Sequence, residues 1–103
     1  MNPFPAFDPV MTAARLAALS HPARLEILRR LGCGTPCCCK EVVDHLDLAQ
    51  STVSQHLKVL VDAGLVRYAP QGPRSLYEID AEALSALSTA LAALVEDCCQ
   101  PSA

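Results

Sequence analysis

The chain has 103 residues, of which 51% are hydrophobic and 18% are charged, and its formal net charge is −3. This length predicts a single domain with a small core, and the apolar runs are too short to span a membrane. Residues 1–5 match neither a secretory signal nor a lipidation motif. We therefore expect a cytoplasmic protein whose cysteines stay reduced.

Positive charge is concentrated in residues 1–77, which hold all eight Lys and Arg against six acidic residues, a net of +2. Residues 78–103 hold five acidic residues and no basic one, a net of −5. A DNA-binding surface needs only local positive charge. The distribution therefore permits DNA binding by the first part of the chain, with the acidic end pointing away from the duplex.

Two helix-start signals open the chain. Asp8 is a suitable N-cap, and the proline after it fits the first position of a helix over 9–19. His21 stands before Pro22, where helical backbone is disfavoured, so we predict a second helix that begins at Pro22. Leucines three residues apart predict its apolar face, namely Leu25, Leu28 and Leu31.

Residues 36–63 predict a helix-turn-helix. Thr35 and Pro36 repeat the start signal, and the third helix would run to about Leu46. After a short turn, Ser51 is a suitable N-cap for a fourth helix over 52–63, which a glycine then closes. The inward positions of these two helices are Val42, Val43, Leu46, Val53, Leu57, Leu60 and Val61.

Residues 65–79 predict a β-hairpin, and a long helix follows it. Strands over 65–69 and 74–79 flank a Pro-Gln-Gly-Pro turn. Asp80 then caps a helix over about 81–98. The expected fold is mainly α (α+β), in the order α-α-α-α-β-β-α, with a wing after the helix-turn-helix.

In such a fold the second helix of the pair enters the major groove of DNA, with its N-terminal residues near base edges. The outward positions of this helix carry hydrogen-bonding or basic side chains, namely Ser51, Thr52, Ser54, Gln55, His56 and Lys58. Arg67 and Arg74 flank the tip of the wing, within reach of the DNA backbone or minor groove. These eight residues are the predicted DNA contacts.

The last predicted helix carries a stripe of leucines that suits a dimer. Leu84, Leu87, Leu91 and Leu94 step by three, four and three residues, and the next step of four reaches Cys98. Alanines between them permit close helix approach. The same stripe could also pack on its own domain. A two-fold dimer would place two recognition helices about 34 Å apart over an inverted-repeat operator.

Four sequence motifs follow one another along the chain: LSHPARL (19–25), STVSQHLKVL (51–60), AGLV (63–66) and GPRSLY (72–77). In their residues, order and spacing these motifs resemble the signature of the ArsR/SmtB family of bacterial metal-responsive repressors. The resemblance covers nearly the whole chain. It implies a homodimeric winged helix that represses its operator until a metal or metalloid binds. It also implies a dimer interface built from the first and last helices.

The six cysteines are grouped: Cys37, Cys38 and Cys39 form one cluster, Cys98 and Cys99 form a second, and Cys33 stands alone. Adjacent thiols bridge each other poorly but suit a single soft ion. Trivalent arsenic or antimony needs three sulfurs, so the two clusters together could hold it. If Cys37 and Cys38 lay in the first turn of the third helix, its dipole would favour their thiolates.

Members of the family often carry Cys-x-Cys near the start of the third helix. Here Cys38 falls on the first of these positions, but Lys40 occupies the second, so the sequence departs from that pattern. The family's zinc site on the last helix uses Asp, His and Glu ligands, and no histidine follows His56. The vicinal pair near the C-terminus resembles that of family members that sense arsenite. The resemblance therefore implies As(III) or Sb(III) as effector.

Three other interpretations stay open. The same fold could sense Cd, Pb, Hg or Zn, or it could be a thiol redox or persulfide sensor, which needs cysteines in disulfide geometry. A winged helix used only for protein contacts is a further alternative. An enzyme with a cysteine nucleophile needs a positioned base, and no histidine is near either cluster in sequence. We therefore predict neither an enzyme nor a catalytic cofactor.

Overall fold

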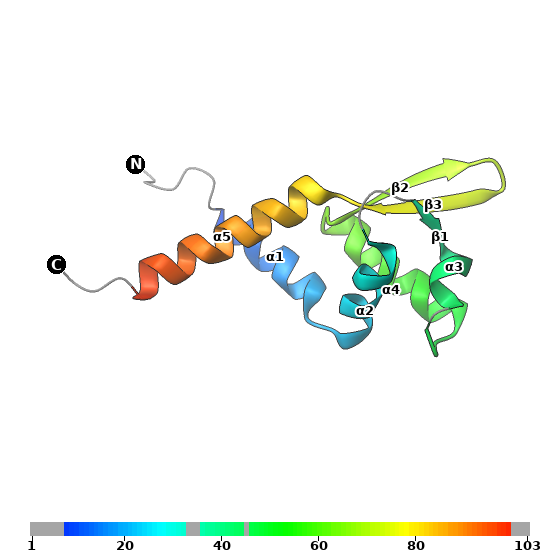
Figure 1. Cartoon of the computed structure of the whole chain (residues 1–103), viewed down its shortest axis with the longest axis horizontal. Helices are drawn as coiled ribbons and strands as arrows, with labels where there is room; N and C mark the ends of the chain where they lie inside the picture. Colours follow the sequence, from blue (N-terminus) through cyan, green and yellow to red (C-terminus); the bar gives the residue numbers. More distant parts are fainter. Residues whose placement is uncertain (1–7, 33–35, 45, 100–103) are drawn as a thin grey trace.

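The structure, a computed structural model, describes residues 8–32, 36–44 and 46–99, and Figure 1 shows their arrangement. The elements in chain order are α1 (Pro9–Leu19), α2 (Pro22–Leu31), β1 (Cys37–Cys38), α3 (Cys39–Val43), α4 (Gln50–Asp62), β2 (Val66–Gln71), β3 (Arg74–Ile79) and α5 (Ala81–Cys99). The expected order is confirmed except for β1, which the sequence did not predict.

The helix-start signals of α1 and α2 work as predicted. One carboxylate oxygen of Asp8 accepts hydrogen bonds from the backbone N–H groups of Val10 and Met11, at 3.0 and 3.2 Å. The Nδ1 atom of His21 accepts from the backbone N–H of Ala23 at 3.0 Å. Each cap satisfies backbone donors that the first turn of a helix leaves unpaired.

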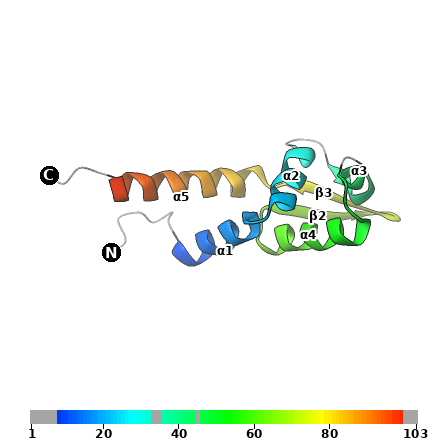
Figure 2. The same cartoon turned by 90° about the horizontal axis from the view of Figure 1, so that it is seen from below.

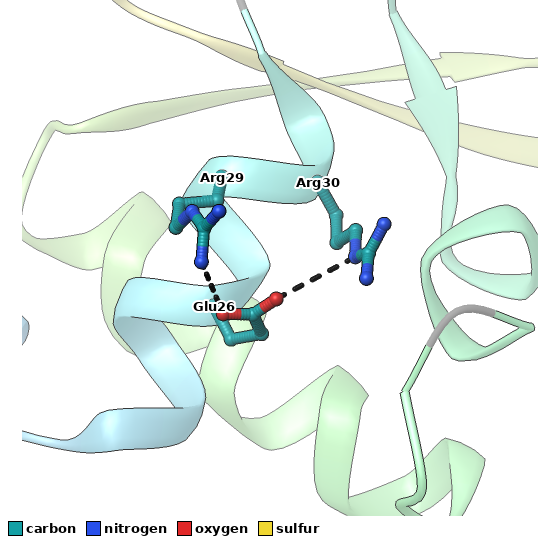
Figure 3. Close-up of polar contacts among 3 residues, drawn as sticks. All are labelled: Glu26, Arg29 and Arg30. Carbon is teal, nitrogen blue, oxygen red and sulfur yellow. Dashed lines mark hydrogen bonds and ion pairs between the residues drawn. The ribbon is translucent and has the colours of Figure 1, made fainter.

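Ion pairs on the exposed side of α2 support its last turn (Figure 3). The carboxylate of Glu26 lies 3.3 Å from Nη1 of Arg29 and 3.6 Å from Nε of Arg30. Both arginines sit at the negative end of the helix dipole, which favours their charge. Exposed pairs of this kind stabilise a helix by a few tenths of a kcal/mol each, about 0.3–0.5.

The core is centred on α4. Val53, Leu57 and Leu60 have no exposed surface, and they pack with Ile27 of α2 and with Leu65. The predicted inward face of α2 was wrong at Leu25, which is 49% exposed. Residues three apart drift around a helix by about 60° at each step, so three leucines at this spacing cannot all face one core.

The start of the third helix was also predicted wrongly. Thr35, its expected cap, lies outside the described residues, while Cys37 and Cys38 are extended and α3 begins at Cys39. In the sheet, Cys37 pairs with Tyr77 and Cys38 with Leu76. The open edge of β3 offers backbone hydrogen bonds to this segment, and that tertiary pairing replaces the first helical turn that proline spacing suggested.

Helix α4 begins at Gln50, two residues before the prediction, and Ala49 rather than Ser51 is its N-cap. Its predicted end is nearly correct. Gly64 adopts a φ of 79°, which lets the chain leave the helix in a left-handed conformation.

The wing is a hairpin in a sheet of order β1-β3-β2. Gln71 pairs with Arg74, which leaves Gly72 and the proline after it as a two-residue turn. The predicted four-residue turn was therefore too long. Pro70 belongs to β2, where it is tolerated because β2 is an edge strand.

The molecule is elongated, with principal extents of 57 × 26 × 21 Å. Helix α5 leaves the wing and runs beside α1 toward one end, while the sheet, α3 and the start of α4 lie at the other (Figures 1 and 2). No helix in the described part of the chain is long and apolar enough to cross a membrane.

Candidate nucleic-acid interface and cysteine clusters

One face of α4 is held in the core and the opposite face is presented to solvent. The packing of α2 and α3 against the buried face fixes the orientation of the helix. The predicted contact residues Ser51, Ser54, Gln55 and Lys58 are exposed, and Thr52 is half-buried. The structure therefore offers a row of hydrogen-bonding side chains along the outside of α4.

Acidic residues accompany two of the predicted basic contacts. The Nζ atom of Lys58 lies 3.0 Å from Oδ2 of Asp62, one helical turn further on. Across the wing, Nη2 of Arg67 lies 2.8 Å from Oε1 of Glu78. Arg74 is exposed beside the wing turn. The first pair was readable from its i,i+4 spacing, whereas the second depends on strand register.

Removing the charge of Asp62 should strengthen DNA binding. The D62N variant leaves Lys58 uncompensated beside the recognition face, so we expect about threefold tighter binding and a steeper salt dependence. Titrations of a labelled duplex at two salt concentrations measure both effects. E82Q is the control, because Glu82 is an exposed acid on α5. Equal tightening by both variants would show a net-charge effect only.

His56 lies at the contact between α4 and α2. Its Nδ1 atom is 3.3 Å from Nη1 of Arg24, and its ring centroid is 4.5 Å from that of His21. Arg24 is itself held by a 2.7 Å hydrogen bond from Nε to the carbonyl oxygen of Ala18. Burial, then His21 and Arg24, lower the pKa of His56 below its usual 6.5. His56 is half-buried here, and its predicted DNA contact stays a prediction.

The depressed pKa of His56 makes stability pH-dependent. Below about pH 6.5 the unfolded chain takes up this proton more readily than the folded one, so the stabilisation present above pH 6.5 is lost as the pH falls. We expect the melting temperature to fall between pH 7 and pH 5, and to fall less in H56Q. Thermal denaturation monitored by circular dichroism measures this, and identical pH profiles would refute it.

The first cysteine cluster spans the junction of β1 and α3. Cys37 and Cys39 are half-buried and pack against the core, whereas the thiol of Cys38 donates to Oε1 of Glu41 at 3.4 Å. Burial, followed by Glu41, raises the pKa of Cys37, and burial followed by Cys38 raises that of Cys39. The expectation that a helix dipole favours thiolates here was wrong, because Cys37 and Cys38 precede the helix.

The second cluster lies at the other end of the molecule. Cys98 and Cys99 are exposed in the last turn of α5, far from β1 along the long axis (Figures 1 and 2). A single chain therefore does not bring the two clusters together, and no group of three potential ligands occurs among the described residues. Cys33 and His45 lie outside those residues.

Apolar side chains are exposed on α1 and on the outer half of α5. Val10 is 79% exposed on α1, and Leu91, Leu94 and Val95 are 42%, 40% and 54% exposed on α5. Leu87, in contrast, is buried against the domain's own core, and Leu84 packs against that core. The leucine stripe thus has an inner half, Leu84 and Leu87, that packs on this domain, and an outer half, Leu91 and Leu94, that is exposed to solvent. Such an exposed patch marks an interaction surface.

Sequence reasoning missed several residues around the interface. Asp62 could have been found from helical spacing, but Arg24, Glu78, and the Tyr68–Ser75 pair of hydroxyl groups at 3.2 Å depend on tertiary packing or strand register. Ser75 lies opposite Pro70 rather than opposite Tyr68, so the contact is a diagonal one that no spacing rule specified.

Comparisons with known proteins agree with this architecture. A family described as a helix-turn-helix domain matches residues 19–69. The chain is 42% identical over 69 residues to an arsenical resistance operon repressor of Staphylococcus xylosus. The matched region covers 67% of this chain and 65% of that relative. The match thus spans just under two thirds of the relative's length.

Solved structures extend the likeness over more of the chain. The crystal structure of an ArsR family transcriptional regulator superposes with a TM-score of 0.78, at 27% identity, over 92% of this chain and 97% of the other. A homodimeric winged helix-turn-helix DNA-binding domain from Mycobacterium bovis gives a TM-score of 0.68, at 28% identity, over 85% and 80%. With its fold, its helix-turn-helix and these likenesses, the chain belongs to the ArsR/SmtB family of winged-helix regulators.

Proposed function

We propose that the protein is a transcriptional repressor that dissociates from operator DNA when cysteine thiolates bind As(III) or Sb(III). The observation that carries this proposal is the position of the first cysteine cluster. Cys37 and Cys38 form a strand of the wing sheet, and Cys39 begins the helix that packs on α4. An ion bound there acts on both DNA-reading elements at once.

DNA reading is assigned to α4 and the wing. The exposed N-terminal half of α4 would enter the major groove, where Ser51, Ser54 and Gln55 can meet base edges. Lys58, Arg67 and Arg74 would contact phosphates or the adjacent minor groove. The buried face of α4 supports this role, since it holds the helix rigidly on the domain.

A homodimer would cover the exposed apolar surface of α1 and α5. A two-fold axis perpendicular to α5 near its middle sets two copies of the helix antiparallel, so that the outer half of each packs along the partner's α5. The similar M. bovis domain is described as homodimeric. This arrangement leaves both recognition helices outward, as an inverted-repeat operator requires.

The same dimer offers a way to bring the two cysteine clusters together. Antiparallel pairing puts the last turn of α5 beside the first turn of the partner's α5, which directly follows β3. Tyr77 and Leu76, the β3 residues that pair with β1, lie three and four residues before Asp80, or roughly 10–13 Å along the strand. We therefore place the ion between protomers, with Cys98 and Cys99 from one and a thiol of Cys37–Cys39 from the other.

The donor set suits a soft, three-coordinate ion. Thiol sulfur prefers such ions over magnesium or calcium. Arsenous acid exchanges its three hydroxyl groups for three thiol sulfurs, and the three thiol protons leave with the hydroxyl groups as three waters. The thiols that supply these protons include groups whose pKa is raised by burial. In this exchange each thiol proton leaves with a hydroxyl group as water, so no net proton is released and the binding of As(III) is nearly independent of pH while the thiols are protonated. A divalent cation such as Cd²⁺ must instead displace the thiol protons, so its binding tightens as the pH rises.

Release of DNA follows from the position of β1. Drawing Cys37 or Cys38 toward the partner's α5 would strain its pairing with β3 and the contact of α3 with α4. The ion and the operator then favour different arrangements of the dimer, and each weakens binding of the other. A nearly complete switch needs a difference of about 5.5 kcal/mol between the two states, which several sulfur–ion bonds can provide.

Competition among ions tests the proposal. The reduced protein is titrated onto an inverted-repeat operator from its own genomic neighbourhood, and arsenite, antimonite, cadmium or zinc is then added. We expect release by arsenite and antimonite at concentrations where zinc has little effect. Release by cadmium alone would favour the cadmium, lead or mercury sensor, and release by oxidant alone would favour a redox sensor.

A further inference from the structure

A groove runs between α4 and the wing, and its wing side is lined by residues that the sequence did not single out. Its volume is about 420 Å³. Ser54, Gln55, Lys58, Val61 and Asp62 form the α4 wall. Ser54, Lys58 and Asp62 follow one another at steps of four, so they lie along one side of the helix, with Gln55 and Val61 beside them. Tyr68, Ser75 and Tyr77 of β2 and β3 form the opposite wall.

The wall on the wing carries a pair of hydroxyl groups. The Oη atom of Tyr68 lies 3.2 Å from Oγ of Ser75, and the Tyr68 ring stands 5.5 Å from that of Tyr77. Tyr68 is 49% exposed although its ring is held by Tyr77. Within a pair of hydroxyls one donates to the other, so one proton stays available for an external acceptor.

The geometry of a winged helix fixes what passes through this groove. When α4 lies in the major groove and the wing reaches the adjacent minor groove, the sugar-phosphate strand that separates the two must run between them. The lining offers a phosphate one lysine, one amide and four hydroxyl groups, against a single carboxylate, that of Asp62, which is paired with Lys58. We propose that it seats a phosphodiester of the operator and that the Tyr68–Ser75 pair donates a hydrogen bond to it. This inference rests on the DNA binding proposed above.

The proposal predicts how Y68F behaves. This variant keeps the ring and its packing on Tyr77 but removes the hydroxyl. We expect roughly tenfold weaker binding, the size of a hydrogen bond to a charged acceptor, and the same loss on operator and on unrelated duplex, because phosphates carry no sequence information. S75A should weaken binding less, since Tyr68 keeps its own donor. S85A, at an exposed serine of α5, is the matched control and should leave binding unchanged.

Methylphosphonate substitution locates the contact. Operators with single neutral linkages are titrated with wild type and Y68F. At one position per half-site, we expect the neutral linkage to weaken wild type and to have little further effect on Y68F, because the same hydrogen bond is already absent. The inference is overturned if Y68F binds the operator as tightly as wild type does. It is also overturned if, at every position, the loss of binding free energy caused by Y68F adds fully to the loss caused by the neutral linkage. Release by arsenite is measured separately, so its failure would not touch this result.

Discussion

Replacing Cys98 and Cys99 by serine is expected to leave operator binding intact and to abolish release by arsenite. The two side chains are exposed at the end of α5, away from the core and from α4, so the fold and the DNA-reading surface are unaffected. The remaining thiols of one chain cannot provide the second half of the proposed site. An electrophoretic or fluorescence titration of the operator complex with arsenite measures the effect, which should be a shift of at least a hundredfold in the releasing concentration.

Two further variants make this prediction specific. The C37S/C38S/C39S protein should also lose the response, whereas C33S should keep it, because Cys33 stands apart from both clusters in the sequence. Mixed dimers provide the sharpest control. A protomer that lacks Cys98 and Cys99, paired with one that lacks Cys37–Cys39, retains one complete site between protomers and should recover part of the response. A full response in either homodimeric variant would contradict the shared site.

The second large effect concerns stability. Leu57 has no exposed surface and lies at the centre of the core on α4. L57A removes three heavy atoms from a closely packed site, so we expect a loss of about 3 kcal/mol from the free energy of unfolding, through lost transfer energy and a residual cavity. In a domain this small, such a loss is a large part of the total.

Urea denaturation of L57A and of V59A tests this expectation. Val59 lies on the same helix but is 37% exposed, so its truncation should cost under about 1 kcal/mol. A similar cost for both variants would mean that α4 is not anchored by its buried face. Since Leu57 does not face solvent, any loss of DNA binding in L57A should follow the unfolded fraction.

The sequence allowed much of the fold to be predicted because its signals were local. Asp8, His21 and Gly64 each act on backbone groups within a few residues. The roles of Asp8 and Gly64 are readable from residue type, and that of His21 from the proline that follows it. The predicted apolar face of α4 was also correct at Val53, Leu57 and Leu60, because the apolar residues that recur at helical spacing are the ones that are buried.

The start of the cysteine segment could not be predicted in this way. Whether Cys37 and Cys38 become helix or strand depends on the open edge of β3, about forty residues away in the chain. The same long-range pairing decides the surroundings of these thiols. The prediction of dipole-favoured thiolates therefore failed together with the prediction of the helix start.

The candidate site shows the same division. Residue type and helical spacing identified the outward side chains of α4, but the acid beside Arg67 and the Tyr68–Ser75 pair required the register of the wing. For the cysteines, the sequence identified the two clusters but not their separation. That separation depends on the direction in which α5 leaves the wing (Figure 2). The sequence left open whether the two clusters would come from one chain or from two, and the separation is why the proposed site is placed between protomers.

Arsenic K-edge X-ray absorption of the reduced, arsenite-loaded protein examines the ion's surroundings most directly. Sulfur donated jointly by the start of α3 and the end of the partner's α5 should appear as three sulfur neighbours and no oxygen. In the C98S/C99S protein, oxygen should return to the first coordination sphere. An arsenic that keeps oxygen ligands in the wild-type protein, or an unaltered three-sulfur spectrum in that variant, would contradict the proposal.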